Sequence, residues 1–206
     1  MRRLLFAILI LGSSCSKMFK YKIVALQPFE NLSAEEIQTV RDSIQYTFDC
    51  KIIILPIKKV PNQYITRIKS FRYRADSILN FLDKIKPDSV DIMLGLTETD
   101  ISITKKDKIT GKTKLPISKY TDWAIFGLGR VNGHSCVVSK KRLHSNVSNH
   151  TYLKRLTRIC NHEVGHVFGL RHCPTKKCLM NDANETIKTI DKSSGKLCKS
   201  CQNKIF

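Results

Sequence analysis

The segment from His162 to His172 constrains the fold more than any other part of the chain. It reads H-E-x-x-H-x-x-G-x-x-H, with three histidines at fixed spacing. His162 and His166 are four residues apart, so on a helix both imidazoles lie on one face. Gly169 can adopt a positive φ, which would end the helix and turn the chain back toward that face. The sequence therefore predicts a helix, a sharp turn, and three imidazoles, the third from His172, that converge on one point.

Three converging imidazoles are a typical ligand set for a catalytic zinc ion, which keeps a further position open for water. Glu163 adjoins the first of these ligands and can reach such a water as its general base. The alternative is a chance match on a core helix, but a motif of this length is expected on the order of once in 100,000 chains of this size. We therefore predict a hydrolytic zinc site.

Four cysteines follow the histidines closely, and the last two form a C-x-x-C. Such a set suits a closed tetrahedral thiolate site that would hold the polar tail of the chain, residues 181–196, in place. Two disulfides are the alternative and would fit an oxidising compartment. The spacing favours zinc, and a bound metal also protects thiolates from oxidation. These four residues are Cys173, Cys178, Cys198 and Cys201.

The combined pattern H-E-x-x-H-x-x-G-x-x-H-C-x4-C-x-M-x17-C-x-x-C resembles that of the archaemetzincins. Segments upstream, at Val90–Leu96 and Ile125–Arg130, are also similar, so the resemblance covers Tyr21 to Cys201. It implies one catalytic zinc on the three histidines and a second, structural zinc on the four cysteines, two per chain. It also implies that Met180 lies in the turn beneath the catalytic zinc, whereas simple core packing is the other interpretation of this residue.

The resemblance further implies a zinc metallopeptidase that acts on a peptide or protein substrate. The substrate would extend along an edge strand at Ala124–Gly127, which can equally be a structural edge. Two other functions remain open, namely a non-catalytic, zinc-stabilised binding protein and a zinc hydrolase of a non-peptide bond. Glu163 argues against the first, because a structural site needs no acid beside its ligand. We expect a monomer, while the preferred side chains of the substrate do not follow from the sequence.

The apolar periodicity predicts an α/β fold in which strands and helices alternate around a largely parallel sheet. The resemblance implies that this sheet is mixed and twisted, with a metzincin-like active-site helix and a C-terminal subdomain pinned by the four-cysteine zinc site. Ser33 and Glu36 form a capping box that starts a helix. Strands are expected at 21–27, 52–57 (buried), 90–96, 123–126 (an edge) and 136–139, and helices at 75–85 and 151–168. Residues 63–73 are expected to form a loop or an irregular helix start, and residues 104–120 a charged loop.

The N-terminus has the composition of a secretory signal. Arg2 and Arg3 precede the apolar run Leu4–Leu11, and small residues then lead to Cys15. This predicts a signal peptide over residues 1–15, of the lipoprotein type with Cys15 lipidated, followed by a peptidase domain over residues 21–206. Gly12 departs from the usual aliphatic residue of such a cleavage site. We expect an exported protein anchored to the cell envelope by its lipid, and the alternative is a cytoplasmic protein.

The formal net charge is +19, but the lysines are scattered and aromatic residues do not alternate with them. The charge therefore predicts no specific nucleic-acid partner, although it is compatible with an anionic membrane. Three cysteines remain, Cys50, Cys136 and Cys160, and their odd number requires at least one free thiol. Buried thiols are the default, and a disulfide of Cys136 with either of the other two stays open. The remaining histidines, His134, His144 and His150, are expected at the surface or in packing.

Overall fold

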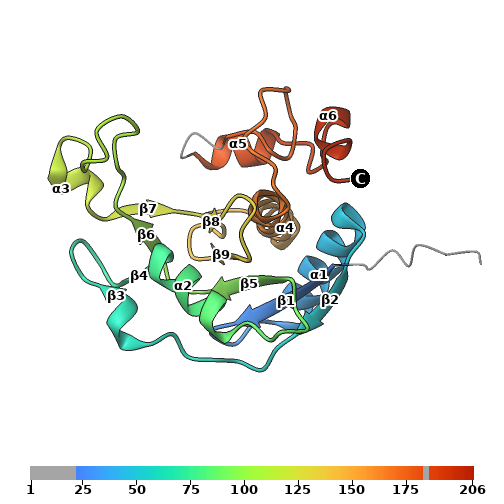
Figure 1. Ribbon diagram of the computed structural model, residues 1–206, viewed down its shortest axis with the longest axis horizontal. Coiled ribbons are helices and arrows are strands. Elements are labelled where there is room, and N and C mark those ends of the chain that lie inside the picture. Colours follow the sequence, from blue (N-terminus) through green and yellow to red (C-terminus); the bar gives the residue numbers. More distant parts are fainter. Residues whose placement is uncertain (1–21, 183–185) are drawn as a thin grey trace, which may run out of the picture.

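The computed structural model describes residues 22–182 and 186–206 (Figure 1). The predictions for the signal peptide and for Cys15 lie outside these residues. Among the described residues, no helix is long and apolar enough to cross a membrane.

A five-stranded sheet forms the centre of the molecule, in the order β2-β1-β5-β9-β8. The first four strands are parallel, and β8 pairs antiparallel with β9 at one edge. This mixed, largely parallel sheet is the one the sequence predicts. The strands are β1 (Ile23–Pro28), β2 (Lys51–Ile54), β5 (Ile92–Thr97), β8 (Gly127–Gly129) and β9 (Ser135–Ser139).

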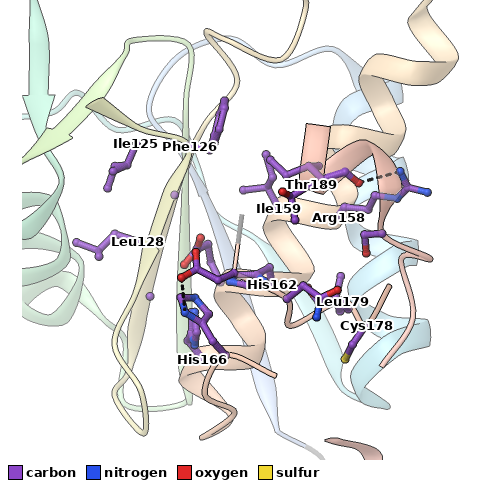
Figure 2. Close-up of a pocket in the computed structure, with 18 of the residues that line it drawn as sticks. Ile125, Phe126, Leu128, Arg158, Ile159, His162, His166, Cys178, Leu179 and Thr189 are labelled. Carbon is purple, nitrogen blue, oxygen red and sulfur yellow. Dashed lines mark hydrogen bonds and ion pairs between the residues drawn. The ribbon is translucent and has the colours of Figure 1, made fainter. Parts of the chain in front are cut away.

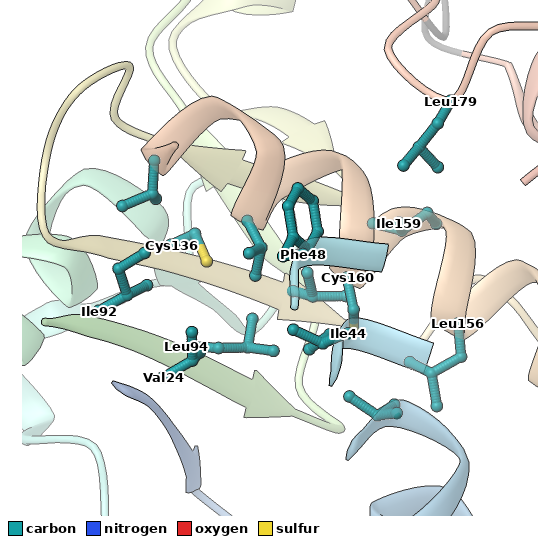
Figure 3. Packing of buried hydrophobic residues seen from close by; sticks show 14 of the residues in the cluster. Val24, Ile44, Phe48, Ile92, Leu94, Cys136, Leu156, Ile159, Cys160 and Leu179 are labelled. Atoms are coloured by element: carbon teal, nitrogen blue, oxygen red, sulfur yellow. The ribbon is translucent and has the colours of Figure 1, made fainter. Parts of the chain in front are cut away.

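Helices cover both faces of this sheet because successive side chains of its strands point to opposite sides. Val24 and Leu26 of β1 face a core formed with α1 (Ala34–Phe48) and α4 (Asn149–Val167), part of which is drawn in Figure 3. Ala25, between them, faces a second core formed with α2 (Ala75–Ile85). The active-site helix α4 therefore lies on the α1 side of the sheet.

The two long helices of that layer, α1 and α4, each begin after a serine that caps the helix N-terminus. The Ser33 side chain accepts from the Glu36 amide while the Glu36 carboxylate accepts from the Ser33 amide, which is the predicted capping box. Ser148 caps α4 by accepting a hydrogen bond from the amide of Thr151. Leu156 and Ile159 lie on the buried face of α4.

A smaller four-stranded sheet, in the order β3-β4-β6-β7, extends the molecule to one side (Figure 1). The sequence predicted a loop or an irregular helix start where β3 and most of β4 lie, which was wrong, but it did predict the strand at β7. The short 3-10 helix η1 (Asn62–Tyr64) precedes this sheet, and α3 (Ile117–Tyr120) lies in the loop before its last strand. Its strands are β3 (Ile65–Thr66), β4 (Arg72–Arg74), β6 (Ile101–Ile103) and β7 (Trp123–Ile125).

Two further details differ from expectation. The run from Ile52 to Ile57 is not a buried strand, because β2 is the outer strand of the main sheet and ends at Ile54. Ile54 and Ile57 are both exposed. The expected edge strand at Ala124–Gly127 is divided at Phe126. Its first part is β7, at the edge of the small sheet, and its continuation is β8, at the edge of the main sheet.

The C-terminal segment folds over α4 with two short helices, α5 (Ile187–Lys192) and α6 (Lys199–Gln202). Arg155 of α4 forms a two-pronged ion pair with Asp191 of α5, in which both nitrogen–oxygen distances are 2.8 Å. The Arg155 guanidinium also donates to the carbonyl of Leu143. These contacts fix α5 against the active-site helix.

Candidate active site

The three histidines of the sequence motif converge as predicted. His162 and His166 project from the last turns of α4, and the helix ends at Phe168. Gly169 follows with φ of +96°, a backbone conformation that a glycine adopts without strain. The chain reverses there, and His172 returns to the other two. One ligand atom from each imidazole lies within 4.8 Å of the others.

Each imidazole has its Nδ1 atom occupied, so that its Nε2 atom is left for a metal. Nδ1 of His162 lies 2.9 Å from the carbonyl oxygen of Leu179, and Nδ1 of His166 lies 2.7 Å from that of Leu170. A carbonyl only accepts, so Nδ1 must carry the proton and Nε2 the lone pair. Nδ1 of His172 lies 3.4 Å from a carboxylate oxygen of Asp182. Such outer partners are typical of zinc-binding histidines.

Burial also favours the neutral form of the His162 and His166 imidazoles, which is the form that binds a metal. Burial, together with the neighbouring His166 and His172, lowers the pKa of His162 to about 4, against the opposing effect of the hydrogen bond to the Leu179 carbonyl. It likewise lowers the pKa of His166, although the hydrogen bond to Leu170 opposes the effect.

Glu163 lies on α4 against strand β8, where only 8 % of its surface is exposed. Burial raises the pKa of its carboxyl to about 8, and a hydrogen bond from the backbone amide of Gly129 partly offsets this. Strand β8 comes very close to it, because a Cβ atom built on Gly127 would lie 2.7 Å from the Oε1 atom of Glu163. A carboxylate held in this way beside three histidines is suited to exchanging protons with a neighbouring water.

A pocket opens in front of the histidines (Figure 2). Residues 124–129 of the β7–β8 segment line one side, and α4 with the C-terminal segment lines the other. Apolar side chains dominate its walls, and the cations Arg142 and Arg158 also contribute to the lining. The apolar wall residues are Ile125, Phe126, Leu128, Ile159, Leu179 and Ile190.

The four C-terminal cysteines form a second cluster, also within 4.8 Å of one another. They are free thiols, with Sγ–Sγ distances of 3.7 Å for Cys173–Cys198 and 3.9 Å for Cys178–Cys201. A disulfide would bring two sulfurs to about 2.0 Å. Four thiolates at tetrahedral positions on zinc lie about 3.8 Å apart, as a zinc–sulfur bond of about 2.3 Å requires. The donor set and its spacing therefore fit zinc and not two disulfides.

Two hydrogen bonds in this cluster favour the thiolate form that zinc needs. The amide of Cys198 points to the Sγ atom of Cys178 at 3.4 Å. A backbone hydrogen bond from Cys201 lowers the pKa of the Cys198 thiol to about 6. The other cysteines, Cys50, Cys136 and Cys160, are buried free thiols, so neither of the disulfides left open by the sequence is present.

Met180 connects the two clusters. Its side chain is fully buried, and its Sδ atom lies 2.6 Å from where a Cβ on Gly165 would be, directly against α4 between the two histidines of that helix. Its carbonyl accepts from the amide of Cys173 at 2.8 Å. The structure thus places Met180 against the helix that carries the histidines, while His134, His144 and His150 lie exposed, outside the cluster.

Comparison with known proteins bears on this arrangement directly. The family model of peptidase family M54 matches residues 16–206. The chain belongs to peptidase family M54. It is 26% identical to the archaemetzincin of Halobacterium salinarum over 192 residues, which covers 89% of this chain and 99% of that protein. The archaemetzincin of Saccharolobus solfataricus is 27% identical over 191 residues, 90% of this chain and 92% of the relative.

Solved archaemetzincin structures show the same fold. The crystal structure of the Methanopyrus kandleri archaemetzincin superposes with a TM-score of 0.71 at 23% identity, over 90% of this chain and 93% of that one. The crystal structure of the Archaeoglobus fulgidus archaemetzincin with malonate superposes with a TM-score of 0.67 at 23% identity. The match covers 89% of this chain and 99% of that one. The chain is therefore a zinc metallopeptidase of the archaemetzincin type.

Some residues around the M54 site have no signal in the sequence motif. The carbonyls of Leu170 and Leu179 and the amide of Gly129 act through the backbone, so no side chain identifies them. Asp182 was also missed, although it follows Met180 by only two residues and a carboxylate near a third histidine is a recognisable sign.

Proposed function

We propose that this chain hydrolyses peptide bonds with Glu163 as general base and with a catalytic zinc ion held by His162, His166 and His172. The observation that carries the proposal is the buried Glu163 carboxylate, set between β8 and three imidazoles whose Nε2 atoms are free. When bound, zinc supplies a Lewis acid that makes water nucleophilic near neutral pH and polarises the scissile carbonyl.

The residues of the chain would do the remaining work. Glu163 accepts a proton from the attacking water and delivers it to the departing amine. The Gly129 amide keeps the carboxylate oriented, and the Leu170 and Leu179 carbonyls hold two imidazoles in the tautomer that binds metal. Because the main sheet ends at β8, an extended peptide would add along this segment, beside the pocket.

A second, structural zinc ion on Cys173, Cys178, Cys198 and Cys201 completes the proposal. The sulfur spacing supports it, and so does the position of the cluster directly after the third histidine. A metal at this point fixes the C-terminal segment that carries Leu179, Met180 and α5, and with them one wall of the pocket. The expected monomeric state and export of the chain stay predictions from the sequence.

The test combines metal analysis with peptide cleavage. Glu163→Gln keeps the size of the side chain and removes its basicity, so we expect hydrolysis of a peptide library to fall by about 100- to 10,000-fold while zinc content is unchanged. The matched control is Glu35→Gln, which changes an exposed carboxylate at the start of α1 and leaves activity intact.

Measured outcomes separate the alternatives. Full peptidase activity in Glu163→Gln would rule out its role as the general base. Zinc retained without cleavage of any peptide by the wild-type chain would favour a binding protein or a hydrolase of another bond.

A further inference from the structure

Two segments of the small sheet lie together at the far end of the molecule from α6 (Figure 1). One is the turn between β3 and β4, residues 67–71, and the other is the long loop between β6 and β7, residues 105–119 with α3. The Lys69 ammonium donates to the carbonyl of Lys119 at 2.7 Å and so joins them. We call these two segments the basic tip.

The basic tip carries a strong excess of positive charge. Two cations in the turn and six in the loop make eight, against a single carboxylate, Asp107. That carboxylate is already engaged within its own turn, where it accepts hydrogen bonds from the amides of Ile109 and Thr110. The eight cations are Arg67, Lys69, Lys105, Lys106, Lys108, Lys112, Lys114 and Lys119.

Large apolar side chains are exposed among these cations. Ile109 is 94% exposed and Leu115 is 78% exposed. The described residues include ten exposed large apolar side chains, and half of them belong to the basic tip. Such a concentration is typical of an interaction surface rather than of a solvated loop, which is what the sequence predicted here. The five side chains are Ile68, Phe71, Ile109, Leu115 and Ile117.

We infer that the basic tip docks on an anionic lipid surface. Lysines attract acidic headgroups, and isolated aliphatic side chains among them can enter the boundary between headgroups and acyl chains. Nucleic acid fits less well, because single-stranded binding needs open aromatic faces. Here cations lie over the aromatic rings: Lys105 and Lys119 over both Tyr120 and Trp123, with ammonium-to-centroid distances between 4.9 and 5.9 Å. The Arg67 guanidinium likewise lies over the Phe71 ring at 5.3 Å.

This surface is continuous with the active-site pocket. Strand β7 leads out of the basic tip at Trp123, and its next two residues, Ala124 and Ile125, line the pocket. Docking would hold the pocket next to the lipid surface, where it meets segments of membrane-associated proteins. This last consequence rests on the proposed peptidase function, whereas docking itself does not.

The single tryptophan of the chain is a local reporter of docking. The full chain with Cys15→Ser, which prevents acylation, is mixed with phosphatidylcholine vesicles that contain brominated lipid, with and without phosphatidylglycerol. We expect Trp123 to be quenched on the anionic vesicles only, and quenching to weaken as salt is raised to about 0.5 M. Because Trp123 adjoins the tip, its quenching reports contact of the tip, and the matched variants separate that contact from any binding through residues 1–15.

Matched triple variants test which lysines are responsible. Lys106→Ser/Lys108→Ser/Lys112→Ser removes three exposed tip lysines, and we expect the affinity measured by quenching to fall roughly 100-fold, about fivefold for each lysine. Lys51→Ser/Lys58→Ser/Lys59→Ser removes three exposed lysines near the opposite edge of the main sheet and should bind as the parent does. Equal affinity of the two triple variants would overturn the proposal.

Two further arms complete the test. Ile109→Ser/Leu115→Ser should also weaken quenching, whereas Tyr46→Ser/Ile57→Ser, exposed elsewhere, should not. Quenching of the parent chain without anionic lipid, or a tip-dependent affinity for a short RNA that exceeds the affinity for vesicles, would contradict a lipid partner. Cleavage of a short soluble peptide stays unchanged in all four variants, so failure of docking and failure of the peptidase proposal remain distinguishable.

Discussion

The position of the Glu163 carboxylate depends on the absence of a side chain at Gly127 of β8, which packs against it. A Cβ atom on Gly127 would lie 2.6 Å from Cγ and 2.7 Å from Oε1 of this carboxylate, well inside van der Waals contact. The glycine therefore allows β8 to pack directly on the acid, exclude water from one side of it, and raise its pKa by burial. The sequence motif identified Glu163, but it gave no reason for the glycines of residues 127–129.

Gly127→Ala should displace the Glu163 carboxylate without removing it. We expect kcat to fall about 100-fold, as displacements of about 1 Å commonly cause, with zinc content unchanged. A double-mutant cycle with Glu163→Asp provides the control, because the shorter acid leaves room for the new methyl group. The double variant should lose less activity than the two single losses predict together. Strict additivity would show that alanine acts elsewhere in the strand.

At the scale of elements, Glu36 joins α1 to the active-site helix. Its carboxylate accepts from the Ser33 amide at 2.8 Å and from the Lys140 ammonium at 2.9 Å, and it accepts a short hydrogen bond from the Tyr152 hydroxyl of α4. Burial alone raises the pKa of Glu36, but the hydrogen bonds from Tyr152, Lys140 and Ser33 outweigh it and hold the pKa below its ordinary value. The ionised form therefore stabilises the packing of α1 on α4.

The sign of this effect predicts a dependence on pH. A lowered folded-state pKa contributes stability that is present above the unfolded pKa of about 4.3 and is lost as pH falls through the lower folded value. Glu36→Gln should reduce the free energy of unfolding at pH 7 by about 3 kcal/mol, and the difference from wild type should shrink below pH of about 4. Urea unfolding at several pH values measures this, with Glu35→Gln as the exposed control. A loss of equal size at every pH would contradict the assignment to ionisation.

The elements that the sequence predicted are those with a local cause. Helices α1 and α2 follow from a capping box or from apolar spacing, and β5 and β9 from short apolar runs that are buried on both faces. Strands β3, β4 and β6 of the small sheet were missed because they are only two or three residues long and are stabilised by distant partners. Arg72 illustrates this, since its contacts with Asp100 and Asp122 span 28 and 50 residues of sequence.

At the scale of the whole molecule, the ligands were predictable and the pocket was not. Both ligand sets obey spacing rules that hold within 40 consecutive residues, from His162 to Cys201. The pocket instead forms where residues 124–129 meet α4 and α5, so its walls depend on how the C-terminal segment is held over the helix. Arg155 and the four cysteines hold that segment at two separate points. Loss of either attachment should therefore change the shape of the pocket and leave the three histidines in place.

Cys201→Ser tests this dependence, because it removes one buried thiolate ligand and leaves the histidines in place. We expect zinc content to fall from about two to about one ion per chain, protease sensitivity to rise after residue 172, and KM for peptides to increase. Cys50→Ala, which alters a buried thiol outside the cluster, should keep both ions. Addition of a thiol-free reductant distinguishes zinc-bound thiolates from disulfides. Zinc-bound thiolates are already reduced, so the melting temperature of the wild-type chain should not change. A marked fall of the melting temperature on reduction would instead show that the four sulfurs are paired in disulfides and that the C-terminal segment is held covalently.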